Sequence, residues 1–174
     1  MRPVRYSVAA SLDGFIADAA GRFDWIPNDP AVDFGALFGR VDTVVMGRRT
    51  YEVMQAADGP TWPPGTRLYV FSRTLQPAEH PDVEVVASGA ADTVARLRAE
   101  AGTGEIWLFG GGELFATLLE AGQVDRVEVT VVPVLLGSGV PLVTDAIGRT
   151  MLKLTDTHRY PSGMVSLTYA VERR

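Results

Sequence analysis

Three short stretches of the chain combine glycine, hydroxyl and arginine residues in a way that suits phosphate groups. They are Gly47-Arg48-Arg49-Thr50, Ser72-Arg73-Thr74 and Gly110-Gly111-Gly112-Glu113-Leu114. Glycine lets an anion approach the backbone, and hydroxyl and guanidinium groups donate hydrogen bonds to phosphate oxygens. Each stretch follows a short apolar run that is typical of a buried strand. Because ligands of open α/β sheets bind at the carboxyl ends of strands, the three stretches predict one cleft for a ligand with several phosphates.

The glycine triplet at 110–112 has two interpretations when it is taken alone. It separates an apolar strand at 105–109 from a helix whose Leu114, Phe115 and Leu118 share one face. The start of that helix presents unpaired N–H groups and the positive end of a dipole, which would bind phosphate. The triplet could equally serve only as a tight turn. The similar joint at Gly47 favours the ligand.

The composition is that of an ordinary globular protein. Its 174 residues are 47% hydrophobic and carry a formal net charge of −5, so we expect a single domain over residues 1–174 and no nucleic-acid partner. There is no cysteine, and we expect His80 and His158 to be solvated, which argues against a metal site. No apolar run approaches the roughly 20 residues of a membrane span. The start of the chain does not resemble a signal peptide, so we expect a cytoplasmic protein with no membrane partner.

Strand and helix patterns alternate over the first 120 residues and give way to strands alone. We expect a helix that starts at Pro30 with Asp29 as its N-cap, and another at 89–101 with Arg98 facing outward. The tail predicts two antiparallel strands in a hairpin. This order predicts an α/β fold with a mixed, mainly parallel sheet. The expected strands are 4–10, 43–46, 68–71, 83–87, 105–109, 127–131, 152–160 and 165–171, and the other expected helices are 48–55 and 113–121.

The order and spacing of these motifs resemble the dihydrofolate reductase superfamily over nearly the whole chain. The segments Ser11-Leu12-Asp13-Gly14-Phe15-Ile16-Ala17 and 132–142, which ends in Leu136-Gly137-Ser138-Gly139-Val140-Pro141-Leu142, look more like the riboflavin-biosynthesis branch. That branch is the C-terminal reductase domain of the bifunctional deaminase-reductase (RibD). The resemblance implies a three-layer α/β/α fold. The zinc motif of the partner deaminase domain is absent from this sequence.

The resemblance also implies that the cofactor is NADPH. By analogy, Gly47, Arg48, Arg49 and Thr50 hold phosphate near the adenosine end of the cofactor. Ser72, Arg73 and Thr74 bracket the 2′-phosphate that distinguishes NADPH from NADH. Gly110, Gly111, Gly112, Glu113 and Leu114 meet the pyrophosphate and the nicotinamide side. In the family one Gly-Gly peptide bond of this joint is cis, and Gly110-Gly111 matches it.

Four further residues are candidates for the substrate side of the cleft. The family places a proton-donating acid on the helix before the strand at 43–46, and Asp33 is our choice, although a first-turn carboxylate also stabilises the helix dipole. Thr130 aligns with the family threonine that supports the substrate ring, or it only pairs across the sheet. Asp13 contacts substrate, orients a lid at 11–25 or caps an Asp-Gly turn. Trp25 stacks on a planar ligand or fills the core.

The sequence therefore predicts an NADPH-dependent oxidoreductase acting on CH–OH or CH–NH type groups. The substrate would be a small pyrimidine- or pteridine-like compound, with 5-amino-6-(5-phosphoribosylamino)uracil as the first candidate. Dihydrofolate reduction is the alternative within this class. An alternative of another class is a nucleotide-binding module without catalysis. The apolar run at 131–136 and the family suggest a homodimer.

Overall fold

The protein, described here from a computed structural model over residues 1–57, 59–144 and 147–172, is built around a mixed eight-stranded sheet. A separate two-stranded sheet joins β2 to β8. The strands are β1 (Val4–Ser11), β2 (Phe15–Asp18), β3 (Val41–Gly47), β4 (Arg67–Phe71), β5 (Glu84–Val86), β6 (Glu105–Gly110), β7 (Arg126–Val132), β8 (Gly139–Pro141), β9 (Leu152–Arg159) and β10 (Val165–Val171). The helices are α1 (Phe34–Phe38), α2 (Arg48–Ala56), α3 (Ala90–Ala99) and α4 (Gly112–Glu120), with a short 3₁₀ helix at Pro77–Glu79.

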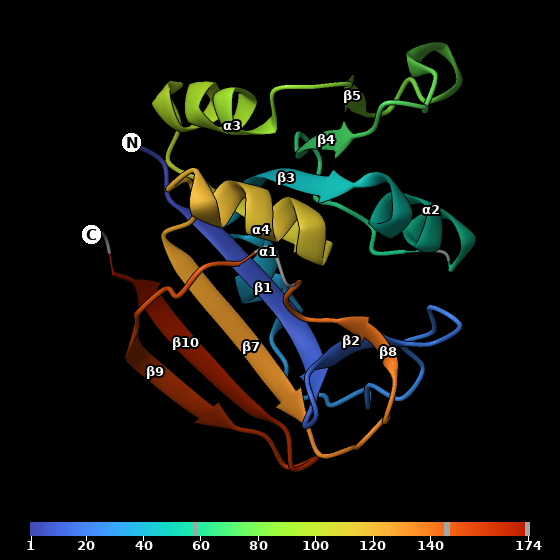
Figure 1. The fold of residues 1–174 in the computed structure, drawn as a ribbon, viewed down its shortest axis with the longest axis vertical. Coiled ribbons are helices and arrows are strands. Elements are labelled where there is room, and N and C mark those ends of the chain that lie inside the picture. Colours follow the sequence, from blue (N-terminus) through green and yellow to red (C-terminus); the bar gives the residue numbers. More distant parts are fainter. Residues whose placement is uncertain (58, 145–146, 173–174) are drawn as a thin grey trace.

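The strand order of the large sheet is β5-β4-β3-β6-β1-β7-β10-β9. The pairs from β5 to β7 are parallel, and β10 then pairs antiparallel with both β7 and β9. The C-terminal hairpin therefore extends a parallel sheet, as the loss of alternating helices in the tail predicted. Figure 1 shows α4 in front of the sheet and α1 behind it, and α3 packs in the same hydrophobic core as α4, so the sheet is the middle layer of three.

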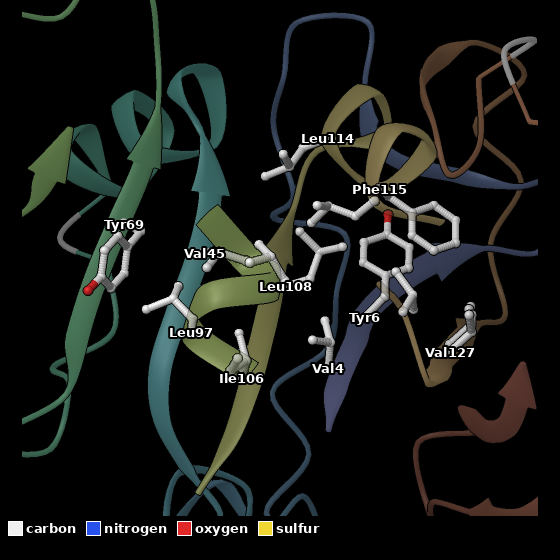
Figure 2. Packing of buried hydrophobic residues seen from close by; sticks show 14 of the residues in the cluster. Val4, Tyr6, Val45, Tyr69, Leu97, Ile106, Leu108, Leu114, Phe115 and Val127 are labelled. Atoms are coloured by element: carbon white, nitrogen blue, oxygen red, sulfur yellow. The ribbon is translucent and has the colours of Figure 1, made fainter. Parts of the chain in front are cut away.

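The larger hydrophobic core lies between the sheet and the helices α3 and α4. Val4, Ile106, Leu108 and Leu97 have no exposed surface there, and Figure 2 shows their side chains converging between the strands and α3. Alternation along the strands explains this, because every second residue of β1 and β6 faces these helices. The ring of Tyr6 stacks on Phe115 of α4 with centroids 4.0 Å apart, so α4 is anchored against the middle of the sheet.

A second, more aromatic core lies on the opposite face of the sheet. Val44, Met46 and Val70 are fully buried there, and Trp107 is nearly so. Residues of α1 and α2 pack on them. Trp62, from the proline-rich loop after α2, lies edge-on to Trp107 with ring centroids 5.9 Å apart. This loop therefore covers the part of the Trp107 face of the sheet that the five-residue helix α1 leaves uncovered.

Two details of the predicted helices were wrong. The helix expected to start at Pro30 begins only at Phe34, and its N-cap is Asp33 and not Asp29. Arg98 of α3 does not face outward: its guanidinium is buried, donates to the carbonyl of Gln123 at 2.8 Å and pairs with Asp125 at 2.8 Å. The apolar periodicity could not reveal this, because an arginine that finds carbonyl and carboxylate acceptors can be buried on an apolar face.

No helix of the described residues is long and apolar enough to cross a membrane.

The packing of the first core can be tested by shortening one side chain. Leu108→Ala should lower the free energy of unfolding by about 2–5 kcal/mol, because Leu108 is fully buried and the cavity cannot refill completely. Denaturant titration followed by circular dichroism would measure it. Leu12→Ala is the control, since Leu12 is 66% exposed and its loss should change stability by less than about 0.5 kcal/mol. Equal effects of the two substitutions would contradict this description of the core.

Candidate active site

A cleft runs across the carboxyl ends of β3, β4 and β6, where the three phosphate-suited stretches meet. Gly47 is in register with Phe71, and Met46 with Gly110, so the strand ends are neighbours in the sheet. All twelve residues predicted to hold the cofactor line this cleft. Its volume is about 1880 Å³, above the range of roughly 300–1,000 Å³ that is usual for one small ligand. The cleft can therefore hold a dinucleotide together with a second molecule.

In the part of the chain that the structure describes, three helices point their N-terminal ends into the cleft, and none of them has a side-chain capping hydrogen bond. The N-cap residues of α2, α3 and α4 are Gly47, Gly89 and Gly111. Their free backbone N–H groups and the positive ends of the helix dipoles form anion-binding positions. The α3 position, at Ser88–Ala90, was missed by the sequence analysis. The signal was present, because Gly89 also stands between a short strand and a helix.

The glycines of the β6–α4 joint are required by close packing. A Cβ atom on Gly110, whose φ is +148°, would lie 3.2 Å from Thr50 Oγ1. A Cβ atom on Gly112 would lie 3.3 Å from both Pro141 O and Thr144 Cγ2. The Gly110–Gly111 peptide bond is cis, as the family resemblance implied. The joint is thus fixed between α2 on one side and the segment after β8 on the other.

The half of the cleft at the ends of β3, β4 and β6, which we call the cofactor half after the sequence-based prediction, presents exposed cations. Arg48 pairs with Glu52 at 2.9 Å on an exposed helix surface. Among the described residues, neither Arg49 nor Arg73 has a hydrogen-bond or ion-pair partner. Both side chains are exposed at the cleft. This half of the cleft therefore attracts negative charge.

Ser72 shapes the turn that carries Arg73. Its side chain is buried, and its hydroxyl accepts hydrogen bonds from the backbone N–H groups of Thr74 at 3.1 Å and Leu75 at 3.0 Å. Its own backbone N–H donates to Val86 O at 3.0 Å, which ties the turn to β5. Ser72 thus fixes the direction of Arg73, besides any contact of its own with a ligand.

Thr144 adds a hydroxyl beside the N-terminus of α4. Its side chain lines the cleft, and its Oγ1 is buried without a hydrogen-bond partner among the described residues. A buried hydroxyl without a partner is costly unless a bound molecule supplies one. Its position next to Gly112 suits an anion at the helix end.

The other half of the cleft, over β1, β7 and the loop before α1, carries mainly acidic groups. The acidic side chains that line it are Asp24, Asp29, Asp33 and Glu128. The guanidinium of Arg40 also lines it. The two halves of the cleft therefore differ in charge, and they suit different chemical groups.

Asp33 and Asp29 both line the cleft but have different surroundings. Asp33 is exposed, and its Oδ1 accepts a hydrogen bond of 2.8 Å from Ala36 N as the N-cap of α1. Asp29 is buried and accepts from Ser162 N at 2.9 Å and Ala31 N at 2.8 Å. A hydrogen bond from the Ser162 side chain first, and then those from the backbone N–H groups of Ala31 and Ser162, hold the pKa of Asp29 below its usual value. Asp29 joins the loop before α1 to the β9–β10 turn, and Asp33 keeps oxygen lone pairs for a ligand.

Thr130 lines the acidic half from the middle of β7. It also pairs with Ala9 of β1 and Ser166 of β10 in the sheet. The two interpretations of this residue are compatible, because its backbone serves the sheet while its side chain is half-buried at the cleft.

Asp13 and Trp25 do not line the cleft. The Asp13 carboxylate accepts from Ser11 Oγ at 2.6 Å, from Gly137 N at 2.7 Å and from Leu136 N at 3.1 Å. These bonds, that from Ser11 first, lower its pKa. Trp25 is half-buried, belongs to neither core, and donates its indole N–H to Arg22 O at 3.1 Å. Phe23, which is 43% exposed, lines the cleft from the same loop and was not predicted.

The loop predicted as a lid at 11–25 is partly anchored. Its β2 segment pairs with β8, and Leu142 N donates to Gly14 O at 2.9 Å. Together with the Asp13 bonds, this fastens the first half of the loop to residues 136–142. The stretch after Asp18 forms a turn of its own, in which Asp18 Oδ1 accepts from Ala20 N at 2.8 Å and from Arg22 N at 2.9 Å.

The two histidines were expected to be solvated, and only one is. His158 of β9 is exposed and lines the cleft. His80 is half-buried, and its Nδ1 lies 3.1 Å from Tyr51 OH. No group of three histidine or acidic side chains placed to hold a metal ion occurs among the described residues.

The strand order, the glycine joint and the cleft define the chain as a dihydrofolate reductase-like α/β protein. It belongs to the RibD C-terminal domain family, whose sequence model matches residues 2–166. The uncharacterized protein YyaP of Bacillus subtilis (strain 168) is 30% identical over 179 residues, which cover 97% of this chain and 94% of YyaP.

Solved structures agree with this assignment. A protein from Shewanella sp. PV-4, provisionally assigned to riboflavin biosynthesis, superposes with a TM-score of 0.83 at 31% identity, over 99% of this chain and all of that one. The diaminohydroxyphosphoribosylaminopyrimidine deaminase/5-amino-6-(5-phosphoribosylamino)uracil reductase of Thermotoga maritima has a TM-score of 0.71 at 19% identity, over 98% of this chain and 57% of its own. At that identity the second likeness shows the fold alone.

Proposed function

We propose that this protein is an NADPH-dependent reductase of a small pyrimidine- or pteridine-like compound. One observation carries the proposal: three phosphate-suited joints converge on one cleft that is large enough for two ligands. The family includes NADPH-dependent reductases, which supports the same function.

The chemistry of the cleft fits NADPH at three positions. Arg73 has no competing partner among the described residues and can bind the 2′-phosphate, together with Ser72 and Thr74. Arg49, at the uncapped start of α2, suits the phosphates near the adenosine end. The uncapped start of α4 and the hydroxyl of Thr144, which has no hydrogen-bond partner within the described residues, suit the pyrophosphate. Glu113 and Leu114 complete this wall.

NADPH, when bound, supplies the hydride, so the protein's own residues must orient the substrate, exclude water and provide a proton. Thr130 lies on the cleft floor and can position the substrate ring. Asp33 is the candidate proton donor, because a carboxyl group within reach of the substrate can deliver a proton directly or through water. The loop after Asp18, with Phe23, can cover the bound ring.

The first substrate to test is 5-amino-6-(5-phosphoribosylamino)uracil, the compound that the Thermotoga maritima protein's name says it reduces. Dihydrofolate is the second, because the fold is that of dihydrofolate reductase.

A cytoplasmic homodimer is also proposed. Support for association comes from Leu152 and Leu154, which are 40% and 50% exposed on the edge strand β9, and from Leu135, which is 70% exposed in the apolar run at 131–136.

The decisive experiment follows NADPH absorbance at 340 nm with each candidate substrate, alongside direct measurement of NADPH binding. We expect NADPH to bind and to be oxidised with at least one compound. Tight binding without oxidation of any pyrimidine or pterin would favour a nucleotide-binding module instead. Absence of NADPH binding would refute the proposal.

The 2′-phosphate assignment predicts that Arg73→Ala discriminates between the two nicotinamide cofactors. Affinity for NADPH should fall about 10- to 100-fold, which corresponds to the loss of one charged hydrogen-bonding partner, while affinity for NADH should change less than about twofold. Isothermal titration calorimetry would measure both. The control is Arg96→Ala, an exposed arginine of α3 paired with Glu100. If NADPH and NADH lose affinity equally, Arg73 does not read the 2′-phosphate.

The role of Asp33 can be tested without losing the helix cap. Asparagine caps helices about as well as aspartate but cannot donate a carboxyl proton, so Asp33→Asn should lower kcat about 100-fold and leave NADPH affinity and the melting temperature nearly unchanged. Asp24→Asn is the matched control, since Asp24 lines the same half of the cleft from the adjacent loop. An unchanged kcat would leave Asp33 with the capping role alone.

A further inference from the structure

A buried ionic group on the floor of the acidic half has no place in the function described so far. Glu128 of β7 is in register with Ser7 of β1, and both side chains line the cleft. The side chain of Arg5, which pairs with Glu128, is 5% exposed, and the side chain of Glu128 is 16% exposed. This part of the sheet borders the aromatic core, since Trp107 Nε1 donates to Ser7 O at 3.0 Å, and the side chains of Ser7 and Glu128 face the cleft.

Arg5 holds the group together. Its Nε and Nη2 donate to the two carboxylate oxygens of Glu105 at 2.8 and 3.1 Å, and its Nη1 donates to Glu128 Oε2. Burial lowers the pKa of Arg5, but the hydrogen bonds and charges of Glu105 and Glu128 outweigh it, and the pKa is raised. Arg5 therefore stays charged, and it fixes the Glu128 side chain from below.

Ser7 fixes the same carboxylate from the side. Its Oγ donates to Glu128 Oε1 at 3.2 Å. A carboxylate has about four acceptor positions, and Arg5 and Ser7 use one on each oxygen. Both oxygens of Glu128 keep an acceptor position, and the residue lines the cleft. The carboxylate is therefore held in a fixed orientation, and each of its oxygens can accept a further hydrogen bond from a ligand.

Comparison with Glu105 distinguishes a ligand-binding role of Glu128 from a purely structural role in neutralising Arg5. Glu105 pairs with the same guanidinium and also with Arg126 at 3.0 Å, and it is 14% exposed. Yet it does not line the cleft, whereas Glu128 and Ser7 do. If Arg5 needed only charge compensation, Glu105 would supply it. The second carboxylate, turned to the cleft, is available to a ligand.

Tyr160 and Asp29 border the same corner. Both line the cleft, and Asp29 is held by the backbone of the β9–β10 turn. Burial, followed by the negative charges of Glu128 and Asp29, raises the pKa of Tyr160. The phenol therefore stays protonated at neutral pH. The carboxylates of Glu128 and Asp29 would repel an anionic group at this corner, whereas they would accept hydrogen bonds from an edge that carries N–H donors.

We infer that Glu128 is a specificity-determining residue that accepts two adjacent N–H groups from the substrate, such as an exocyclic amino group and the neighbouring ring N–H. The preferred substrate then presents an amino N–H next to a ring N–H at this edge, as pterin does and as the 6-amino and N1–H edge of the first candidate uracil does. This inference rests on the proposed reductase function, because it assigns the acidic half of the cleft to the substrate. Two parallel N–H···O bonds to one carboxylate give both affinity and orientation.

Two fluorescent probes of the same size test the inference: pterin, which has the amino group, and lumazine, in which a carbonyl replaces it. Their dissociation constants for the full chain would be measured by fluorescence titration, with and without NADP⁺. We expect pterin to bind at least about tenfold more tightly than lumazine. Glu128→Gln should reduce this preference to about one, because an amide offers only one acceptor oxygen and adds a donor.

Glu105→Gln is the matched control, since it disturbs the same Arg5 network outside the cleft. It should leave the pterin preference unchanged even where it lowers the melting temperature as much as Glu128→Gln does. If Glu128→Gln fails to fold, Ser7→Ala tests the same carboxylate more mildly, and the preference should fall about two- to fivefold.

Three results would overturn the inference: no preference for pterin in the unaltered protein, an unchanged preference in Glu128→Gln, or an equal loss in Glu105→Gln. NADP⁺ binding, measured in the same titrations, separates this failure from failure of the reductase proposal. If NADP⁺ binds but pterin is not preferred, only the role proposed for Glu128 is refuted. If NADP⁺ does not bind but pterin is clearly preferred, only the proposed reductase function is refuted.

Discussion

The functional architecture depends on parallel pairing between β4, β3 and β6. Parallel strands end at the same edge of a sheet, so the chain must leave each of them at the same place, and it leaves two of them through a glycine into a helix. Free N–H groups at a helix start need partners, and no side chain of Gly47, Gly89 or Gly111 can supply one. The edge is therefore short of hydrogen-bond acceptors, and in the proposed function the phosphates of the cofactor supply them.

The part of the sheet formed by β1, β7, β10 and β9 contributes a polar surface to the cleft. Where β10 and β9 join β7, the chain turns antiparallel, and the cleft opens over the face that carries Ser7 and Glu128. Side chains on that face can therefore be polar, whereas the corresponding positions on β3 and β6 are buried under aromatic rings. One continuous sheet thus provides an electropositive edge and an acidic floor beside it.

Much of this could be predicted from sequence because it follows from local patterns. Strand alternation, the glycines after β3 and β6, and the polar hairpin of the tail located the elements and the strand ends that line one half of the cleft. Patterns could not place side chains whose partners come from distant segments. Arg98 is buried because Gln123 and Asp125 accept its hydrogen bonds, and Glu128 meets Arg5 only once β1 and β7 pair. Asp13 and Trp25 were expected at the substrate, but their hydrogen bonds are made outside the cleft.

The strand β9 leaves the long sheet with an open border, since all eight of its residues are exposed and it has β10 on one side alone. Unpaired backbone groups along such a border can recruit strands from other molecules. Lys153, Asp156 and Arg159 interrupt its apolar residues with charges of both signs. Indiscriminate stacking into fibrous aggregates is thereby discouraged, and only a surface with a complementary sequence of charges can lie against it.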